Sequence, residues 1–390
     1  MEFDIFNQDV DTVTECQVCE SIDFNKVSSV NVKGINFFET SICRQCGLVV
    51  RTRRPSLDWL INCWNQRDKN QKEQHVLPID PKVESDRYQR YLGLEELLNN
   101  YTNEKRVLDV GSGTGGGLKS FKDKGWNVLG IEPDDSRARY GIETYGVDTI
   151  VDTFENVLIE SKFPLVTMIH SLEHFRDPLE KLKLAKEFVE DGGVLYIAVP
   201  DALTRIQDWS DSIYLGHLVN FMEYNLCLLG ARIGLTPILR TYPRTTEFGV
   251  DNLGILFRND NKITSDTTPK TRYTTGGLQK DILRIIDRYH SNRKTHNGIL
   301  YLNLEQINDL SLGFKGPSYS NHFNNINSNY LTLNSNGTYN VKPCENDLVL
   351  LTEKLKSFSI QGFSSMLGLQ LARSLKGYDA NFKKVRFSLY

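Results

Sequence analysis

The residues best suited to chemistry are Asp109 and the glycines that follow it. Gly111, Gly113 and Gly115 form G-x-G-x-G, while Gly116 completes an overlapping G-x-G-x-x-G. Both patterns suit a turn whose backbone approaches a nucleoside-bearing ligand, so the spacing alone does not separate a dinucleotide from other such ligands. Asp109 does separate them, because a carboxylate that faces the ligand repels a pyrophosphate and attracts an ammonium group.

S-adenosylmethionine carries an ammonium group and no phosphate, so the charge of Asp109 favours it as the cofactor. A second acid, Glu132, ends the next predicted strand, where its oxygens can accept hydrogen bonds from ribose hydroxyls. Pro133 follows directly and is expected near the adenine. Asp109, the three glycines, Glu132 and Pro133 are therefore predicted to bind the cofactor.

Alternating strands and helices are needed to position these residues. Apolar runs and helical spacing predict strands at 107–110, 126–131, 149–151, 165–169 and 194–199, and helices at 84–99, 116–124, 178–190 and 221–233. Asp177 is expected to cap the helix that starts at Pro178, and residues 191–193 to end it. This alternation predicts an α/β fold with a parallel sheet covered on both faces. Residues 237–242 and 253–257 are expected to add an antiparallel hairpin.

Three segments in order resemble motifs of class I S-adenosylmethionine-dependent methyltransferases. They are V-L-D-V-G-S-G-T-G at 107–115, G-I-E-P at 130–133 and L-E-H-F-R-D-P at 172–178. The resemblance implies a Rossmann-like sheet and a carboxylate near the adenine amino group, for which Asp152 is the candidate. The alternative role for Asp152 is a loop acid or a cap for the next turn. His170, directly after the fourth strand, is counted with the cofactor-binding residues, and Pro164 departs from the acid usual before that strand.

Transfer to a hydroxyl or carbon acceptor needs a group that removes a proton. His217 follows the fifth predicted strand and is the first candidate for the base, with capping or packing of the next helix as its alternative. Glu173 and His174 are further catalytic candidates, which otherwise only fix their loop. Some related methyltransferases bind a divalent ion through E-x-x-E-H in this segment, and here His170 replaces the first acid.

Four of the seven cysteines form two Cys-x-x-Cys pairs, Cys16 with Cys19 and Cys43 with Cys46. Two such pairs separated by 23 residues suit a tetrahedral zinc ion, whose four thiolates leave no open position for chemistry. A structural zinc site is therefore predicted, with two disulfides or four buried thiols as alternatives. The remaining Cys63, Cys227 and Cys344 are expected to be ordinary small buried residues.

The second cysteine pair continues as C-x-x-C-G-L-V and leads to Arg53-Arg54-Pro55. This arrangement, ahead of the methyltransferase motifs, is similar to the zinc-ribbon methyltransferases of bacterial sugar and surface-polysaccharide pathways over residues 15–258. The resemblance implies an amino-terminal module that helps to hold a sugar nucleotide. For the basic run Arg51-Thr52-Arg53-Arg54, a solvated turn is expected, with a substrate phosphate contact as the alternative.

The 390 residues are expected to divide into a zinc-ribbon module at 1–80, a class I methyltransferase domain at 81–260 and an accessory α/β region at 261–390. In the last region, residues 264–275 are predicted to be a linker, and 278–289 and 366–375 to be helical. A net charge of −3 argues against nucleic acid as a partner. Without an apolar span or a secretory signal, a cytoplasmic location is expected.

Taken together, these observations predict methyl transfer from S-adenosylmethionine to oxygen or carbon of a sugar or sugar nucleotide in surface glycan synthesis. One alternative is a methyltransferase that acts on rRNA bases, some of which also carry an amino-terminal zinc module. The other is a non-catalytic protein that binds the cofactor.

Overall fold

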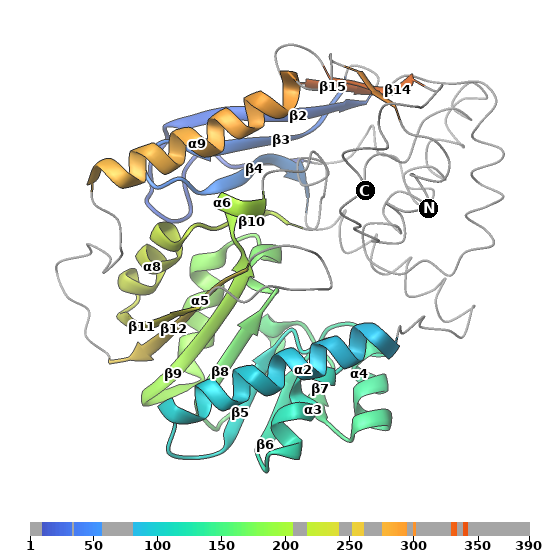
Figure 1. Cartoon of the computed structure of the whole chain (residues 1–390), viewed down its shortest axis with the longest axis vertical. Coiled ribbons are helices and arrows are strands. Elements are labelled where there is room, and N and C mark those ends of the chain that lie inside the picture. Colours follow the sequence, from blue (N-terminus) through green and yellow to red (C-terminus); the bar gives the residue numbers. More distant parts are fainter. Residues whose placement is uncertain are drawn as a thin grey trace.

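The computed structural model describes residues 10–32, 35–56, 81–205, 217–241, 252–260, 275–294, 299–301, 329–333 and 338–341. These residues form two β-sheets, one above the other in the view of Figure 1. The lower sheet carries the glycine turn, and the upper sheet carries the four paired cysteines. Among the described residues, no helix is both long and apolar enough to cross a membrane.

The lower sheet has seven strands in the order β11-β12-β9-β8-β5-β6-β7. Its strands β5 to β9 run parallel, and β12 and β11 add the predicted antiparallel hairpin at one edge. The predicted parallel sheet and its closing hairpin are thus confirmed. The bounds are β5 (Arg106–Val110), β6 (Asn127–Ile131), β7 (Asp148–Ile150), β8 (Phe163–Ile169), β9 (Val189–Pro200), β11 (Leu235–Thr241) and β12 (Asn252–Asn259).

Helices cover both faces of this sheet because the side chains of a strand alternate between its faces. Val107 packs in one cluster with Leu118 and Phe121, while the adjacent Leu108 packs in the other with Leu182 and Leu226. All six side chains are buried, and each contributes about 1.5–3 kcal/mol by leaving water. The bounds are α2 (Pro81–Leu98), α3 (Gly116–Asp123), α4 (Asp135–Tyr140), the π-helical η2 (Gly141–Tyr145), α5 (Pro178–Glu187) and α8 (Glu223–Arg232).

Helix α5 begins as predicted and ends earlier than predicted. Asp177 Oδ1 accepts a hydrogen bond from the Glu180 backbone N at 3.1 Å, which confirms the cap. The helix stops at Glu187, and β9 already begins at Val189, which pairs with Phe163 of β8. The register shifts between Phe163 and Leu165, so Pro164 lies at an irregular point of the ladder, where a missing N–H is tolerated.

The upper sheet joins segments from both ends of the chain. Its strands follow the order β1-β4-β3-β2-β15-β14-β13, and β10 pairs with β4. Strand β15 is parallel to β2, so residues 338–341 are hydrogen-bonded beside residues 29–32. The bounds are β1 (Val10–Thr12), β2 (Phe24–Val32), β3 (Ile35–Cys43), β4 (Val49–Pro55), β10 (Val219–Asn220), β13 (Ile299–Tyr301), β14 (Asn329–Leu333) and β15 (Thr338–Val341).

Helix α9 (Thr275–Lys294) lies against this upper sheet (Figure 1). It contains the predicted helix 278–289, and its Leu278, Ile282 and Ile285 pack with Ile42 and Val49 in one buried cluster. Residues of the last third therefore cover strands of the first 80. The division into three regions remains a prediction. The predicted helix 366–375, residues 264–274 of the predicted linker, Cys63 and Cys344 lie outside the described residues.

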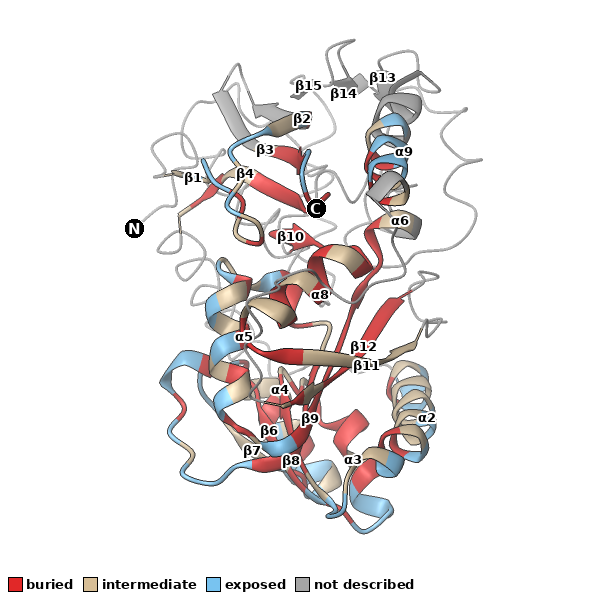
Figure 2. Cartoon of the chain, turned by 90° about the vertical axis from the view of Figure 1, so that its left-hand side faces the viewer, coloured by how far each residue is buried: buried red, intermediate tan, exposed pale blue. Residues whose placement is uncertain are grey.

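The basic run is a strand, so the prediction of a solvated turn was wrong. Arg51, Arg53 and Arg54 belong to β4, which Figure 2 colours mainly as buried. Arg51 is 2% exposed and Arg54 is 6% exposed. The reason is pairing that is remote in sequence, because β4 is bonded to β3 along one edge and to β1 and β10 along the other.

Candidate functional site

The glycine turn connects β5 to α3 at the carboxyl end of the sheet. Gly111, Gly113 and Gly115 have φ values of +83°, +58° and +73°, a region that favours glycine. A Cβ on Gly115 would lie 3.3 Å from the Cα of Gly141, whereas a Cβ on Gly113 would meet nothing within 4 Å. The turn is therefore closed against a helix at Gly115 and faces open space at Gly113, where a ligand can approach the backbone.

Asp109 lies at the base of this turn and is 1% exposed. Its Oδ1 accepts a hydrogen bond from Thr167 Oγ1 at 2.7 Å. Burial raises the pKa of Asp109 to about 7, and the charge of Glu132 adds to the rise, while the Thr167 bond and Arg87 oppose it. A cation bound beside this carboxyl would favour its ionised form.

Glu132 joins the glycine turn to the end of β6. Its Oε2 accepts a hydrogen bond from Gly113 N at 2.8 Å, and its Oε1 accepts one from Asp134 N at 2.9 Å. This carboxylate thus fixes the turn, a role that the sequence did not indicate. Its contact with ribose hydroxyls remains a prediction. Pro133, beside it, is exposed, and its place near the adenine likewise remains a prediction.

Helix α2 holds the turn from the outside through residues that sequence reasoning missed. Arg87 Nη1 donates to Glu84 Oε1 and to Thr114 Oγ1, both at 2.6 Å, and Thr114 Oγ1 donates to Glu84 Oε2 at 2.7 Å. The i, i+3 spacing of Glu84 and Arg87 is visible in the sequence, but their common partner in the turn is not.

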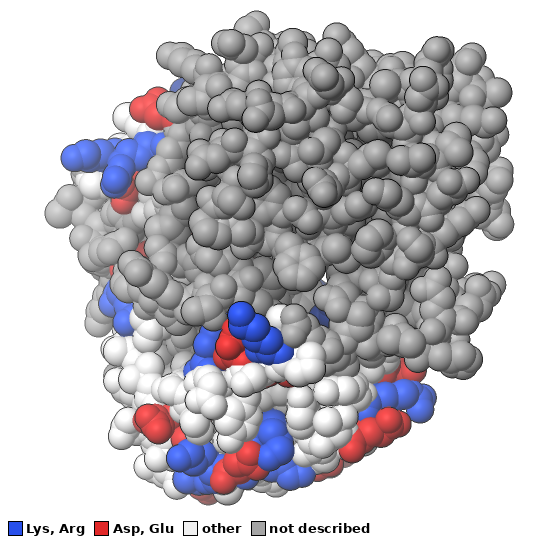
Figure 3. Space-filling model, turned by 45° about the vertical axis from the view of Figure 1, so that its right-hand side comes forward, with Lys and Arg blue, Asp and Glu red and all other residues white. Residues whose placement is uncertain are grey.

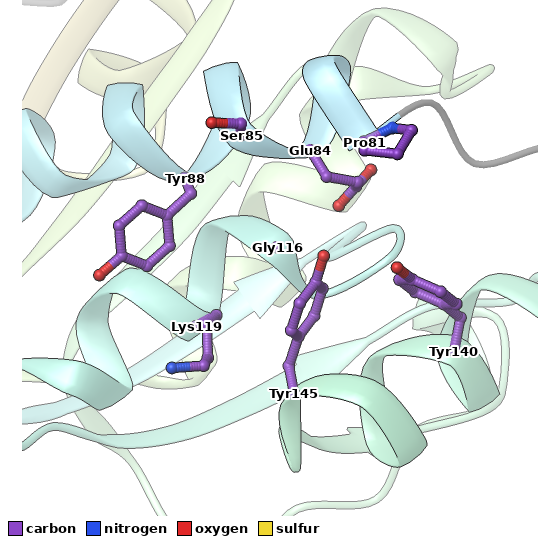
Figure 4. Close-up of a pocket in the computed structure, with 8 residues that line it drawn as sticks. All are labelled: Pro81, Glu84, Ser85, Tyr88, Gly116, Lys119, Tyr140 and Tyr145. Carbon is purple, nitrogen blue, oxygen red and sulfur yellow. The ribbon is translucent and has the colours of Figure 1, made fainter.

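A pocket of about 310 Å³ opens beside these hydrogen bonds, between α2, the start of α3 and η2 (Figure 4). None of the predicted cofactor-binding residues lines it. Its lining residues are Pro81, Glu84, Ser85, Tyr88, Gly116, Lys119, Tyr140 and Tyr145.

His170 and Ser171 stand directly after β8, beside the glycine turn. His170 has a φ of +55°, which is strained for a residue with a side chain, and its backbone N donates to Ala198 O at 2.8 Å. A Cβ on Gly111 would lie 3.0 Å from the Cβ of Ser171, so the two segments meet. Among the described residues, neither His170 Nε2 nor Ser171 Oγ has a hydrogen-bond partner, although both atoms are buried. Buried polar atoms are normally paired, so a ligand beside the turn fits this arrangement.

Asp152 lies in an exposed loop two residues after β7. Its Oδ1 accepts hydrogen bonds from Thr153 N at 2.7 Å and from Asn156 Nδ2 at 3.1 Å. These contacts agree with the alternative role of a loop cap. The adenine contact remains a prediction.

The three predicted catalytic residues meet in space. Glu173, in the short helix η4 (Leu172–His174), is fully buried, and its Oε1 lies 4.0 Å from His217 Nε2. The rings of His174 and His217 are 5.0 Å apart between centroids. Leu218 N donates to Glu173 O at 2.9 Å, which holds the His217 segment against η4.

The electrostatics of this group suit a base. Burial raises the pKa of Glu173, but the hydrogen bond with His170 and the charges of His174 and His170 outweigh it, so the net pKa is lowered. An ionised carboxylate beside a histidine stabilises its protonated form and so strengthens it as a base. Ligand atoms of Glu173, His174 and His217 also lie within 4.8 Å of one another, so this group could hold a metal ion, and the divalent-ion alternative stays open.

The four paired cysteines also meet. Their Sγ atoms all lie within 4.8 Å of one another, with Cys16 and Cys46 at 3.6 Å and Cys19 and Cys43 at 3.5 Å. These separations are too long for disulfides, and all four thiols are free. The hydrogen bond with Cys16 and those with the other two thiols lower the pKa of Cys43. Four thiols at this spacing could hold a metal ion, and zinc at this site remains a prediction.

The family comparison agrees with this geometry, since residues 84–239 match the family model of a methyltransferase domain. Residues 84–239 therefore carry a methyltransferase domain. The matched segment begins in α2 and ends in β11, so this domain includes every predicted cofactor-binding and catalytic residue. The cysteine cluster lies outside it.

Two curated relatives match part of the chain. An uncharacterized methyltransferase of Staphylococcus carnosus is 30% identical over 112 residues, which are 27% of this chain and 54% of that protein. A ubiquinone biosynthesis O-methyltransferase of Actinobacillus pleuropneumoniae is 33% identical over 105 residues, or 24% of this chain and 45% of that protein. The chain thus spans about half the length of the curated relatives it matches.

Among solved structures, a methyltransferase of Thermotoga maritima, described as a possible histamine N-methyltransferase, is 18% identical. It matches with a TM-score of 0.38 and covers 50% of this chain and 99% of its own.

Proposed function

We propose that the protein transfers a methyl group from S-adenosylmethionine to oxygen or carbon of a sugar or sugar nucleotide in surface glycan synthesis. The observation that carries the proposal is the meeting of Glu173, His174 and His217 beside the turn that starts at Asp109. His217 stands 43 positions after His174 in the sequence, and the fold brings the ligand atoms of His217, His174 and Glu173 within 4.8 Å of one another. Such an arrangement serves both sides of a transfer reaction.

On the cofactor side, the chain's residues bind and orient. Asp109 would attract the ammonium group, Gly113 would leave room at the backbone, and Ser171 and His170 would offer buried polar atoms. Bound S-adenosylmethionine supplies an activated methyl group on its sulfonium. Because that leaving group is already activated, positioning accounts for much of the rate.

On the acceptor side, His217 would remove the proton from the acceptor hydroxyl or carbon. Glu173 would stabilise the resulting imidazolium from 4.0 Å away, without itself meeting solvent. A positioned base of this kind contributes typically about 10²–10⁴-fold to the rate. The relative from Actinobacillus is named for an O-methylation, which supports oxygen chemistry for this domain.

A sugar acceptor is supported by the placement of the cysteine module. Strand β4 of that module pairs with β10, so Val50 lies opposite Val219, two residues after His217. The module that resembles zinc ribbons of sugar methyltransferases therefore adjoins the predicted base. We further propose that Cys16, Cys19, Cys43 and Cys46 bind a structural zinc ion that keeps β4 in this position.

The charge distribution favours a small-molecule acceptor over RNA. On the described part of the face shown in Figure 3, Lys and Arg alternate with Asp and Glu. Binding to a polyanion such as RNA relies on a continuous basic surface. The chain instead has a net charge of −3, the same sign as that of RNA.

The test is incubation of the full chain with labelled S-adenosylmethionine and a panel of sugar nucleotides. Label is expected to appear in at least one sugar nucleotide with the wild-type protein and to be lost with His217→Ala. Transfer to rRNA, with every sugar nucleotide unlabelled, would refute the sugar assignment. Cofactor binding without transfer to any acceptor would favour the non-catalytic alternative.

A further inference from the structure

Thr167 carries a hydroxyl that the packing of its strand does not need. It lies within β8, between the apolar residues Val166 and Met168, and is 1% exposed. Because both faces of a parallel sheet are covered, an apolar side chain of the same shape, such as valine, would fill this position without burying a polar group. A buried hydroxyl costs free energy unless it forms a hydrogen bond. The hydrogen-bond partner of Thr167 therefore indicates what the hydroxyl does.

That partner is Asp109, on the neighbouring strand. Thr167 and Asp109 are paired in the parallel register of β5 and β8, so their side chains leave the sheet on the same face. Val107 and Leu165, the pair two residues earlier, lie on this face in one buried cluster with Leu118 of α3. At the end of this apolar layer, Thr167 Oγ1 donates to Asp109 Oδ1 at 2.7 Å.

The oxygen of this hydroxyl is fixed in place, and only its proton can turn. Threonine is β-branched, so its χ1 angle is stiff. Asp109 Oδ1, at 2.7 Å, is much closer to Thr167 Oγ1 than Leu108 O, at 3.5 Å. A hydrogen bond to an ionised carboxylate is stronger than one to the neutral acid, so the donated proton favours the ionised form of Asp109. The same bond holds Oδ1 and leaves Oδ2 to meet a ligand.

Thr167 is one of several groups that act on Asp109. Burial raises the pKa of Asp109 to about 7, the Thr167 hydrogen bond lowers it, the charge of Glu132 after β6 raises it, and the charge of Arg87 on α2 lowers it. Tyr91 of α2 also faces Asp109, and burial raises the pKa of Tyr91 well above its usual range, so this phenol stays neutral. A substitution of Thr167 by a residue of the same shape removes its hydrogen bond and leaves the other groups in place.

We propose that Thr167 is a positioning residue of the methyl-donor site, which keeps the Asp109 carboxylate ionised and turned toward the ammonium group of S-adenosylmethionine at neutral pH. The proposal rests on the proposed function. It adds a residue outside the glycine turn that acts through Asp109 and sets the pH range in which the cofactor binds.

The first test measures the titration of Asp109 in the free full chain, from the carboxyl carbon signals of isotope-labelled aspartate. The signal that is missing from Asp109→Asn identifies Asp109. Thr167→Val replaces the hydroxyl by a methyl group, and the titration midpoint is expected to rise by about one pH unit, because a hydrogen bond to a charged group is lost. Thr167→Ser, which keeps the hydroxyl, is expected to titrate like the wild type.

The second test is calorimetric titration with S-adenosylmethionine at pH 7 and pH 8.5. With the midpoint about one pH unit higher, roughly 10% of Asp109 is ionised at pH 7 in place of about half, so Thr167→Val is expected to bind about fivefold more weakly than the wild type. At pH 8.5 the carboxylate is largely ionised in both proteins, so the difference is expected to fall below about 1.5-fold. The titration of the cofactor itself is common to both proteins and cancels in the ratio.

A matched control removes another buried hydroxyl. Ser120 Oγ donates to Gly117 O within α3 at 2.7 Å, and Ser120→Ala is expected to leave the midpoint of Asp109 unchanged. An unshifted midpoint in Thr167→Val, or a loss of affinity that is equal at both pH values, would overturn the proposal. Failure of Thr167→Val to fold would also overturn it, because the strand itself would then require the hydroxyl.

The two measurements separate this proposal from the proposed function. Cofactor binding by the wild type together with an unshifted titration of Thr167→Val would refute the positioning role alone. A shifted titration without any cofactor binding by the wild type would refute the proposed function, and the positioning role with it.

Discussion

Cofactor affinity is expected to depend on pH through Asp109. In the free protein, burial raises the pKa of this carboxyl from 3.8 to about 7, so the cation-binding form is scarce in mildly acidic solution. With a pKa of about 7, roughly 3% of Asp109 is ionised at pH 5.5 and about half at pH 7. If only the ionised form binds, the affinity for S-adenosylmethionine rises about fifteenfold over this interval, or about 1.6 kcal/mol. The α-amino group of the cofactor stays largely protonated throughout.

Calorimetry at several pH values measures this dependence, and buffers of different ionisation enthalpy count the protons released on binding. About half a proton per bound cofactor is expected to leave at pH 7. Asp109→Asn is the matched control, because it removes only this carboxyl and leaves every other titratable group in place. An affinity that is flat between pH 5.5 and 7, or a pH dependence that Asp109→Asn retains, would refute the reasoning.

Three other perturbations follow from the geometry. His217→Gln is expected to lower the transfer rate about 10²–10⁴-fold with unchanged affinity for S-adenosylmethionine, and equal loss of both would count against a base. Gly113→Ala is expected to cost about 1–2 kcal/mol of unfolding free energy, because its φ is positive, and to abolish cofactor binding; retained affinity would show that no ligand approaches there. Cys43→Ser is expected to lose bound zinc and expose the amino-terminal sheet to protease, whereas Cys227→Ser, a buried thiol of α8, keeps the metal. Equal metal content of the two variants would contradict the zinc site.

The raised pKa of Asp109 also predicts how the stability of the free protein depends on pH. Because the folded state holds this proton more tightly than the unfolded chain, the unfolding free energy falls as the pH rises from about 4 through about 7. The contribution reaches about 4 kcal/mol, since each pKa unit corresponds to about 1.4 kcal/mol. Asp109→Asn is therefore expected to unfold at a higher temperature than the wild type at pH 8, with a smaller difference at pH 5. A variant that is less stable at both pH values would show that the ionised carboxylate stabilises the fold.

Local signals predicted the parts of the structure that depend on neighbouring residues. The helix cap at Asp177 and the turn at Gly111 to Gly115 arise from residues within a few positions of one another. The apolar runs of the buried strands are equally local, because both faces of a parallel sheet are covered. The meeting of Glu173 with His217 could also be foreseen, since both follow strands that end at the same edge.

Contacts between remote segments escaped prediction. Arg51 to Arg54 look like a solvated run, and only the pairing of β4 with β3 and β10 makes them a buried strand. The partnership of β15 with β2 joins residues more than 300 positions apart, in a region without any motif. Likewise, nothing in the sequence links Glu84 and Arg87 to Thr114, whose hydroxyl forms hydrogen bonds with both side chains in the fold.

The most direct measurement of the central claim is calorimetric titration of the full chain with S-adenosylmethionine at pH 7.5. One cofactor molecule per chain is expected to bind, and Asp109→Ala is expected to abolish the signal while the protein still unfolds cooperatively. Absence of saturable binding by the wild type, or undiminished binding by Asp109→Ala, would contradict the assignment of this turn as the methyl-donor site.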